Sequence, residues 1–182
     1  MKINFFLPIL MVITMGFSSC VKDINLDQVN DFNSEPRYIA SLVYFKIPAL
    51  GFLDSSNNEI TTSISDETRL DLIEEEVFQK YLKEVKLDFE ISNPFDRNIQ
   101  VELQFLDEAN GITYQIGPIL IPAKTAKVVY QETISVAGTP QFLNSRNIKV
   151  LSQLITTTGS PIEANNTEEF EFKSAGTFTF QI

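Results

Sequence analysis

Histidine and tryptophan are absent from this chain of 182 residues, and cysteine occurs once, at Cys20. Without histidine the chain lacks the usual acid–base residue near neutral pH, the Ser-His-Asp triad and most zinc sites. A lone cysteine forms no internal disulfide and offers no pair of thiolate ligands. Phosphate-binding glycine loops, GxGxxG and the GxSxG nucleophile motif are also missing. The sequence therefore predicts a protein that is not an enzyme and holds no cofactor and no metal.

Positive charge is scarce as well. The chain has 14 Lys and Arg residues against 24 Asp and Glu, a formal net charge of −10. An acidic surface repels the phosphate backbone of nucleic acids and the headgroups of anionic lipids. We therefore expect no nucleic-acid partner.

The N-terminus has the three parts of an export signal. A single early cation, Lys2, precedes an apolar stretch over residues 5–15, and small residues then lead to Cys20. The apolar stretch is shorter than the roughly 20 residues that cross a bilayer. The end of this segment, Gly-Phe-Ser-Ser-Cys, resembles the lipobox of bacterial lipoproteins, with Phe17 at a position usually held by Leu. The resemblance implies that residues 1–19 are cleaved and that Cys20 is lipidated.

Residues 20–36 are predicted to be the lipidated cysteine and a polar tether that ends at Pro36. Lys22 and Asp23 directly follow the cysteine, and they resemble the export tags of surface lipoproteins in the Bacteroidota. A plain solvated tether would have a similar composition. We expect an outer-membrane lipoprotein held by the lipid on Cys20, and we prefer the cell surface to the periplasmic face.

Residues 37–182 are predicted to form one β-rich domain. Loss of residues 1–19 leaves 163 residues, with 13 basic and 24 acidic side chains and a net charge of −11. That length is typical of a single domain with a substantial core. The whole chain resembles small lipoproteins of flavobacterial type, which implies a location and a fold but no activity.

Alternating apolar and polar residues mark most of the domain's strands. The first segment, 37–47, is apolar on both faces and is predicted to be a buried central strand. Residues 48–68 are rich in turn-forming residues. A helix is predicted over 69–82, where Ile73, Val77 and Tyr81 recur every four residues, with Ser65 or Asp66 as its cap. Further strands are predicted at 85–91, 99–105, 112–116, 125–136 and 148–157. Residues 170–180 are predicted to form a last strand or a pair of strands, interrupted at 174–176. A short helical turn is predicted to begin at Thr139 and Pro140.

Two turns are predicted to connect neighbouring strands as hairpins. Residues 93–98 separate two amphipathic strands, and Asp107–Gly111 contains an Asn-Gly pair suited to a positive φ. The segment from Val85 to Asp107, with Asn93-Pro94-Phe95 in its middle, resembles the Asn-Pro hairpin of late-embryogenesis-abundant type 2 domains. That resemblance implies an immunoglobulin-like fold. We therefore predict an antiparallel, immunoglobulin-like β-sandwich with one or two short helices.

Carboxylates are the only candidates for chemistry. Asp71, Glu74 and Glu75 are candidates for a catalytic pair, although a solvated helix face explains them better. A calcium site is conceivable at Asp107, Glu108 and Asn110, but the alternating ligands and distant Glu of a calcium loop are missing, so we interpret the segment as a turn. The acids at 66, 67 and 71 fit a calcium loop no better.

Glycan binding usually requires exposed aromatic platforms. Tyrosine would have to supply them, since tryptophan is absent. Tyr81 is the one expected to be exposed; Tyr38, Tyr44, Tyr114 and Tyr130 lie in strand patterns and are expected in or near the core.

Two functions remain. The first is a non-catalytic interaction module, an accessory subunit of an outer-membrane complex for transport, secretion or assembly, with contacts from edge strands or from residues 48–82. The alternative is a lipoprotein that binds a glycan or another small molecule in loops at one end of the sandwich.

Overall fold

The structure of the chain is a computed structural model, and it describes residues 34–182. The predicted signal peptide, the lipidation site Cys20 and the tether as far as residue 33 lie outside the described residues. Ser34 is already part of the folded domain, because it exchanges backbone hydrogen bonds with Ile182 (N to O distances of 3.2 and 3.1 Å). Residues 34–36, predicted as the end of the tether, therefore contact the folded domain.

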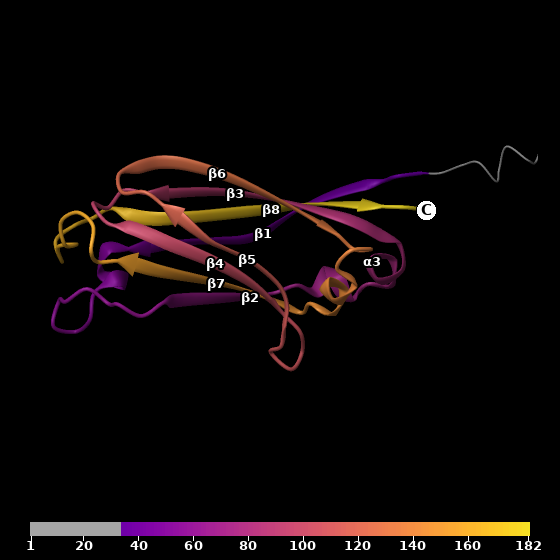
Figure 1. The fold of residues 1–182 in the computed structure, drawn as a ribbon, viewed down its shortest axis with the longest axis horizontal. Coiled ribbons are helices and arrows are strands. Elements are labelled where there is room, and N and C mark those ends of the chain that lie inside the picture. Colours follow the sequence, from indigo (N-terminus) through magenta and orange to yellow (C-terminus); the bar gives the residue numbers. More distant parts are fainter. Residues whose placement is uncertain (1–33) are drawn as a thin grey trace, which may run out of the picture. The chain divides into compact units, whose positions relative to one another are not determined.

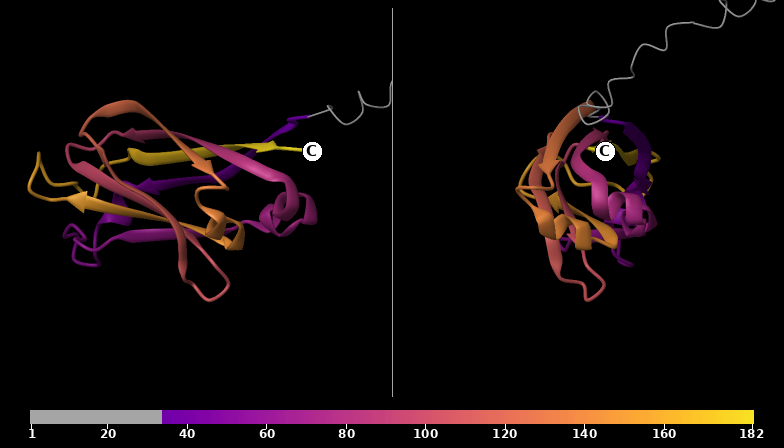
Figure 2. Two further views of the ribbon diagram at one scale, coloured as in Figure 1. Left: turned by 45° about the vertical axis from the view of Figure 1, so that its right-hand side comes forward. Right: turned by 90° about the vertical axis from the view of Figure 1, so that its right-hand side faces the viewer.

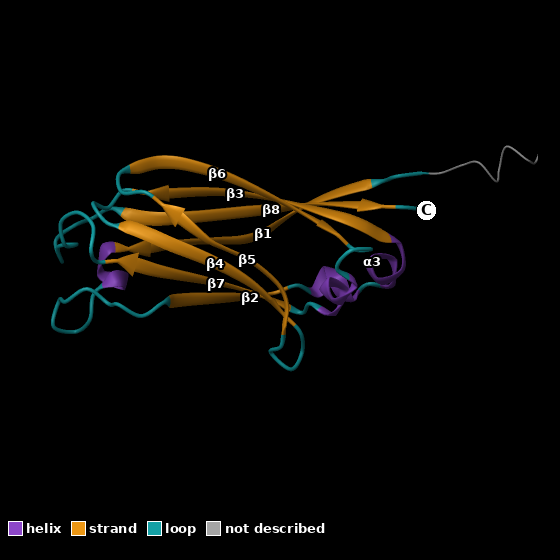
Figure 3. Cartoon of the chain, in the orientation of Figure 1, coloured by secondary structure: helices purple, strands orange, loops and turns teal. Residues whose placement is uncertain are grey.

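Eight strands make up most of the described domain (Figures 1 and 3). They are β1 (Arg37–Pro48), β2 (Ile64–Arg69), β3 (Leu82–Asn93), β4 (Asn98–Leu106), β5 (Ile112–Ile121), β6 (Thr125–Ser135), β7 (Asn147–Ile155) and β8 (Glu169–Phe180). One α-helix and three 3₁₀ turns lie at the ends of the sandwich: η1 (Ala49–Phe52), η2 (Asp71–Glu74), α3 (Glu76–Tyr81) and η3 (Pro140–Asn144).

The strands form two four-stranded antiparallel sheets, in the orders β1-β8-β3-β6 and β2-β7-β4-β5. The sheets face each other as two layers (Figure 2). Fully buried phenylalanines from both sheets fill the space between them, among them Phe89, Phe105 and Phe172. The prediction of a mostly β, antiparallel sandwich is confirmed.

The strand order specifies the kind of sandwich. Pairing is nested, because β1 pairs with β8, β2 with β7, β3 with β6 and β4 with β5. The chain is thus one long antiparallel ribbon, with its tip at the β4–β5 turn, rolled into two sheets. This is the jelly-roll arrangement. It differs from the immunoglobulin order, in which the first two strands share a sheet.

The predicted hairpin at residues 93–98 is wrong, although both of its strands exist. β3 pairs with β6 and β8, whereas β4 pairs with β5 and β7, so the connection crosses from one sheet to the other. The buried Asn93 side chain holds this crossing: its amide donates to the carbonyls of Arg97 (2.7 Å) and Pro122 (3.0 Å). The turn at Asp107–Gly111 does join paired strands, with Asn110 at a φ of 63°.

Strand β1 was predicted to be central, and the structure places it at the edge of its sheet. Only Val43 among its residues is buried, while Tyr44 is 60% and Ile39 is 70% exposed. Its register against β8 shifts between Ser41 and Tyr44, which is a bulge of the kind that protects edge strands. An apolar composition on both faces therefore does not place a strand inside a sheet.

The helix in the segment 69–82 is shorter than predicted, and it buries a different side chain from the one predicted. α3 covers only six residues, and Phe78 is its buried side chain, whereas Val77 is 52% exposed. Ser65 and Asp66 lie within β2, and neither η2 nor α3 has a side-chain cap. The turn at Pro140 forms as predicted, although Thr139 does not cap it through its side chain.

Two other strands are longer than predicted. β5 continues past Gly117 and a cis Gly117–Pro118 bond to Ile121, with a shift in its register against β4. β8 runs without a break through residues 174–176, where Ser174 hydrogen-bonds both backbone groups of Val43 at the bulge. Small residues in β8 thus fit a bulge in its neighbour and do not end the strand.

Candidate functional site

The two long sides of the sandwich differ in how they are closed. On one side, β5 and β6 are bridged by Glu132, whose two carboxylate oxygens accept hydrogen bonds from the hydroxyls of Tyr114 (2.8 Å) and Tyr130 (3.1 Å). Burial and the bond to Glu132 raise the pKa of Tyr114 to about 12. The pKa of Tyr130 is raised for the same reasons. Side-chain hydrogen bonds therefore link the two edge strands on this side, whose outer backbone edges are also unpaired in the described domain.

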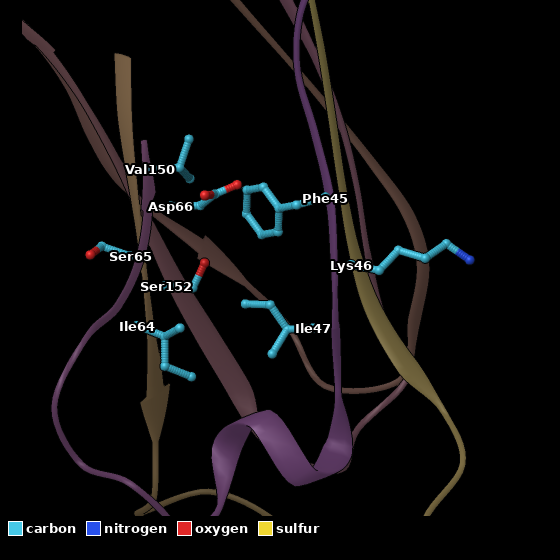
Figure 4. A pocket seen from close by; sticks show the side chains of 8 residues that line it. All are labelled: Phe45, Lys46, Ile47, Ile64, Ser65, Asp66, Val150 and Ser152. Atoms are coloured by element: carbon cyan, nitrogen blue, oxygen red, sulfur yellow. The ribbon is translucent and has the colours of Figure 1, made fainter. Parts of the chain in front are cut away.

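On the opposite side, a hollow of about 210 Å³ lies between the edge strands β1 and β2 (Figure 4). We call this hollow the edge cleft. Residues from β1, β2 and β7 surround it: Phe45, Lys46, Ile47, Ile64, Ser65, Asp66, Val150 and Ser152. No strand pairs with the outer edge of β1 or of β2 in the described domain, so both strands have an unpaired edge beside the cleft.

Strand register decides which side chains enter the cleft. Ile64 and Asp66 pair with Ser152 and Val150, two floor residues that are each 1% exposed. Because side chains alternate along a strand, Ile64 and Asp66 point toward the inside of the sandwich, and Ser65 points outward. Phe45 forms the opposite wall, stacked on Phe172 at a ring distance of 5.3 Å.

The floor of the cleft holds an unpartnered hydroxyl. Ser152 is buried, and its Oγ is the one buried side-chain N or O atom of residues 34–182 that has no hydrogen-bond partner. Figure 4 shows this oxygen directed into the hollow. A buried polar group without a partner costs about 1–3 kcal/mol.

A carboxylate stands at the mouth of the cleft. The side chain of Asp66 points toward the ring of Phe45 in Figure 4, and its Oδ1 accepts a hydrogen bond from the backbone N–H of Glu67 at 3.0 Å. Lys46 does not neutralise it, because the lysine turns away from the cleft and pairs with Glu169 at 3.0 Å. The cleft thus combines apolar walls, one free carboxylate and one free hydroxyl, which suits an apolar group that ends in a hydrogen-bond donor.

The loops at one end of the sandwich are locked in place by a buried ion pair. The guanidinium of Arg97 binds the carboxylate of Glu59 through two hydrogen bonds (2.9 and 2.8 Å), and it also donates to the carbonyls of Thr158 and Gly159. Asp96 accepts a hydrogen bond from the backbone of Ser160, which lowers the pKa of Asp96. These contacts tie together the loops after η1, β3 and β7.

A second hollow, of about 330 Å³, lies among these locked loops. Phe95 and Ile162 are its buried apolar residues. Polar and charged side chains make up most of the remaining lining: Asp96, Lys124, Glu163, Asn165 and Asn166.

The carboxylates considered from the sequence lie apart from both hollows, except for Asp66. Asp71 and Glu74 bind the exposed guanidinium of Arg69, at 2.7 and 2.6 Å. Asp107 binds the backbone N–H groups of its own turn, at Ala109 (2.9 Å) and Gly111 (2.7 Å). Within residues 34–182, no group of three or more acidic or cysteine side chains is placed to hold a metal ion.

The tyrosines are distributed differently from the prediction. Tyr38 and Tyr44, expected in or near the core, are 53% and 60% exposed on the edge strand β1. Tyr114 and Tyr130 are half-buried as expected, while Tyr81, expected to be exposed, is half-buried. Tyr44 donates to Glu171 (3.0 Å), so its ring is held along the sheet.

Sequence reasoning missed the residues of the edge cleft. One signal was available: residues 148, 150, 152 and 154 share the inward phase of β7, and Ser152 is the polar member of an otherwise apolar set. The sequence around Asp66 shows no such pattern, because β2 lies in a segment rich in turn-forming residues.

No protein-family profile matches the chain, and no curated protein matches it. Solved structures that this chain resembles include the VP2 subviral particle of infectious bursal disease virus, at 7% identity and a TM-score of 0.45 over 80% of this chain. A protein of Parabacteroides distasonis, described as secreted, has 15% identity and a TM-score of 0.43 over 64% of this chain. This chain spans about a third of each of these two proteins, 32% and 38%. In residues 34–182, no helix is both long and apolar enough to span a bilayer.

Proposed function

We propose that the protein is a non-catalytic lipoprotein of the bacterial outer membrane, and that its open β1–β2 side binds another protein of the envelope. The observation that carries the proposal is the edge cleft: two unpaired strand edges flank a hollow whose floor holds the unpartnered Ser152. Unpaired edges bind extended segments through backbone hydrogen bonds, and nearby hollows select side chains.

The size of the cleft favours a protein segment over a free ligand. Pockets for drug-sized molecules measure roughly 300–1,000 Å³, and the edge cleft measures about 210 Å³. A hollow of this size accepts a side chain, while the strands beside it supply the rest of the contact. Ser152 also has no basic partner to activate it as a nucleophile among the described residues, which supports binding over catalysis.

Membrane attachment is supported by the lipobox-like sequence that ends at Cys20. Replacement of Cys20 by serine should release the protein from the membrane fraction, because the thiol that carries the lipid is gone. Fractionation of cells in high salt measures this. A Cys20→Ser protein that still sediments with membranes would contradict the anchor.

Binding is tested by extraction of the lipidated protein with a mild detergent, followed by size analysis. We expect a species larger than the monomer, which Asp66→Arg at the mouth of the cleft reduces. Glu67→Arg is the matched control: it is the next residue on the same strand and has the same charge change, but it points outward. A monomer in every sample, or equal effects of both variants, would contradict the proposal.

A second candidate function is supported by the hollow among the locked loops. Its volume of about 330 Å³ falls in the range of small-molecule sites, and its amide and carboxylate side chains suit a glycan. Envelope glycans that bind there should raise the melting temperature of the protein by mass action, and Asn166→Ala should remove the rise. A screen without any rise would count against this function.

A further inference from the structure

The edge cleft has a definite chemical preference. Phe45, Ile47 and Ile64 give it apolar walls, and Asp66 places a carboxylate at its mouth. Within residues 34–182, Asp66 makes no ion pair, and the nearest lysine of β1, Lys46, is held on the other face of its strand by Glu169. An occupant that is apolar along its length and positively charged at its end complements all of these features.

Resting on the proposed function, we infer that the occupant of the edge cleft is a lysine or arginine side chain of an extended partner segment. The aliphatic stem would lie on Phe45 and Ile64, and the cationic head would meet the carboxylate of Asp66. The segment's backbone would pair with the free edge of β2, since the cleft and that edge run side by side.

Charge on a larger scale favours the same occupant. The predicted mature chain has 13 basic and 24 acidic residues, and β2 places Asp66 at the mouth of the cleft. Arg69, the one basic residue of β2, is already bound to Asp71 and Glu74. A basic segment is therefore attracted to this edge, and an acidic one is repelled.

A purely structural explanation of Asp66 predicts something different. Inward-pointing charges on edge strands hinder strand addition, so Asp66 could serve only to keep other chains away from β2. In that case, removal of its charge would increase contacts at this edge. The inference predicts the opposite, since the carboxylate would be the group that holds the partner.

Site-specific photocrosslinking in cells of the source bacterium separates these outcomes. Benzoylphenylalanine in place of Ser65 reports on the β2 edge, and the same residue in place of Val129, which is 60% exposed on the β6 edge, is the control position. We expect one adduct from position 65 and none from position 129. Mass spectrometry of the adduct should locate a lysine or arginine within a few residues of the crosslink.

Charge-removing variants complete the test. Asp66→Asn should lower the yield of the adduct about tenfold, because a charge-assisted hydrogen bond is lost, and Glu67→Gln should leave it unchanged. An adduct that survives Asp66→Asn, increases with it, or maps to a segment without a basic residue would overturn the inference and leave the proposed function standing. The absence of any adduct from position 65 would overturn both.

Discussion

Replacement of Arg97 by methionine should lower the free energy of unfolding more than the loss of an exposed ion pair does. The side chains of Arg97 and Glu59 are only 8% and 11% exposed, and each hydrogen bond between them is 2.9 Å or shorter. Loss of one partner leaves the other charge buried without compensation, which typically costs about 3–5 kcal/mol. The carbonyls of Thr158 and Gly159 also lose their donor.

The assay is urea unfolding of the mature chain with Cys20→Ser, followed by far-UV circular dichroism, because the chain has no tryptophan. Arg69→Met is the matched control, since Arg69 also binds two carboxylates but is 52% exposed and should lose no more than about 1 kcal/mol. The double variant Glu59→Leu with Arg97→Met should lose less than the two single changes added together. Equal losses for Arg97→Met and Arg69→Met would refute the reasoning.

Three further predictions concern other parts of the domain. Ser152→Ala should raise the melting temperature by about 2–4 °C in calorimetry of the purified protein, because an unpartnered hydroxyl is removed; a lower melting temperature would show that the hydroxyl is already satisfied. Since the folded-state pKa of Tyr114 is about 12, above its ordinary value of 10.0, stability linked to this group is complete below pH 10 and falls as the pH rises toward 12. Alkaline unfolding of Tyr114→Phe should lack that part of the decline, and identical profiles would contradict the raised pKa of Tyr114. Gly159→Ala should cost at least about 1–2 kcal/mol in urea unfolding, because a Cβ at this φ of +61° would lie 1.4 Å from the Asp96 carbonyl oxygen, and a neutral effect would contradict the loop geometry.

The positions of most strands could be predicted from the sequence, because alternation of apolar and polar residues is a local property. Strands β3, β4 and β7 lie close to where the alternation places them, with inward residues such as Val85 and Val101 fully buried. The one strand missed is β2, whose Ile64–Arg69 carries five polar or charged residues in a row and shows no alternation. A short edge strand buries few of its side chains, so it can form without an alternating apolar pattern.

Strand pairing could not be predicted in the same way. In a ribbon with nested pairs, only its tip, β4–β5, is a local hairpin, and there the Asn-Gly turn gave the right answer. Every other pair joins segments far apart in the sequence, so the short Asn93–Asn98 connection looked like a hairpin although it crosses between sheets. Its determinant is the buried amide of Asn93, which bonds carbonyls from two different loops.

The candidate site could not be predicted either, because it also depends on contacts between segments that are distant in the sequence. The edge cleft exists because β1 and β2, 16 or more residues apart in the sequence, end up at the same open side of two different sheets. The sequence did suggest edge strands and residues 48–82 as contact surfaces. Composition alone did not identify which side chains line the cleft. The Tyr114–Glu132 hydrogen bond between β5 and β6, on the opposite side, likewise joins residues whose proximity depends on the fold.

Hydrogen–deuterium exchange at β2 tests the binding role of the open side most directly. The backbone amides of Ile64–Arg69 should exchange about tenfold or more slowly in native membranes than in the purified protein, while those of residues 127–131 on β6 should exchange alike in both. Equal exchange at β2 in the two samples would contradict docking of a partner at this edge.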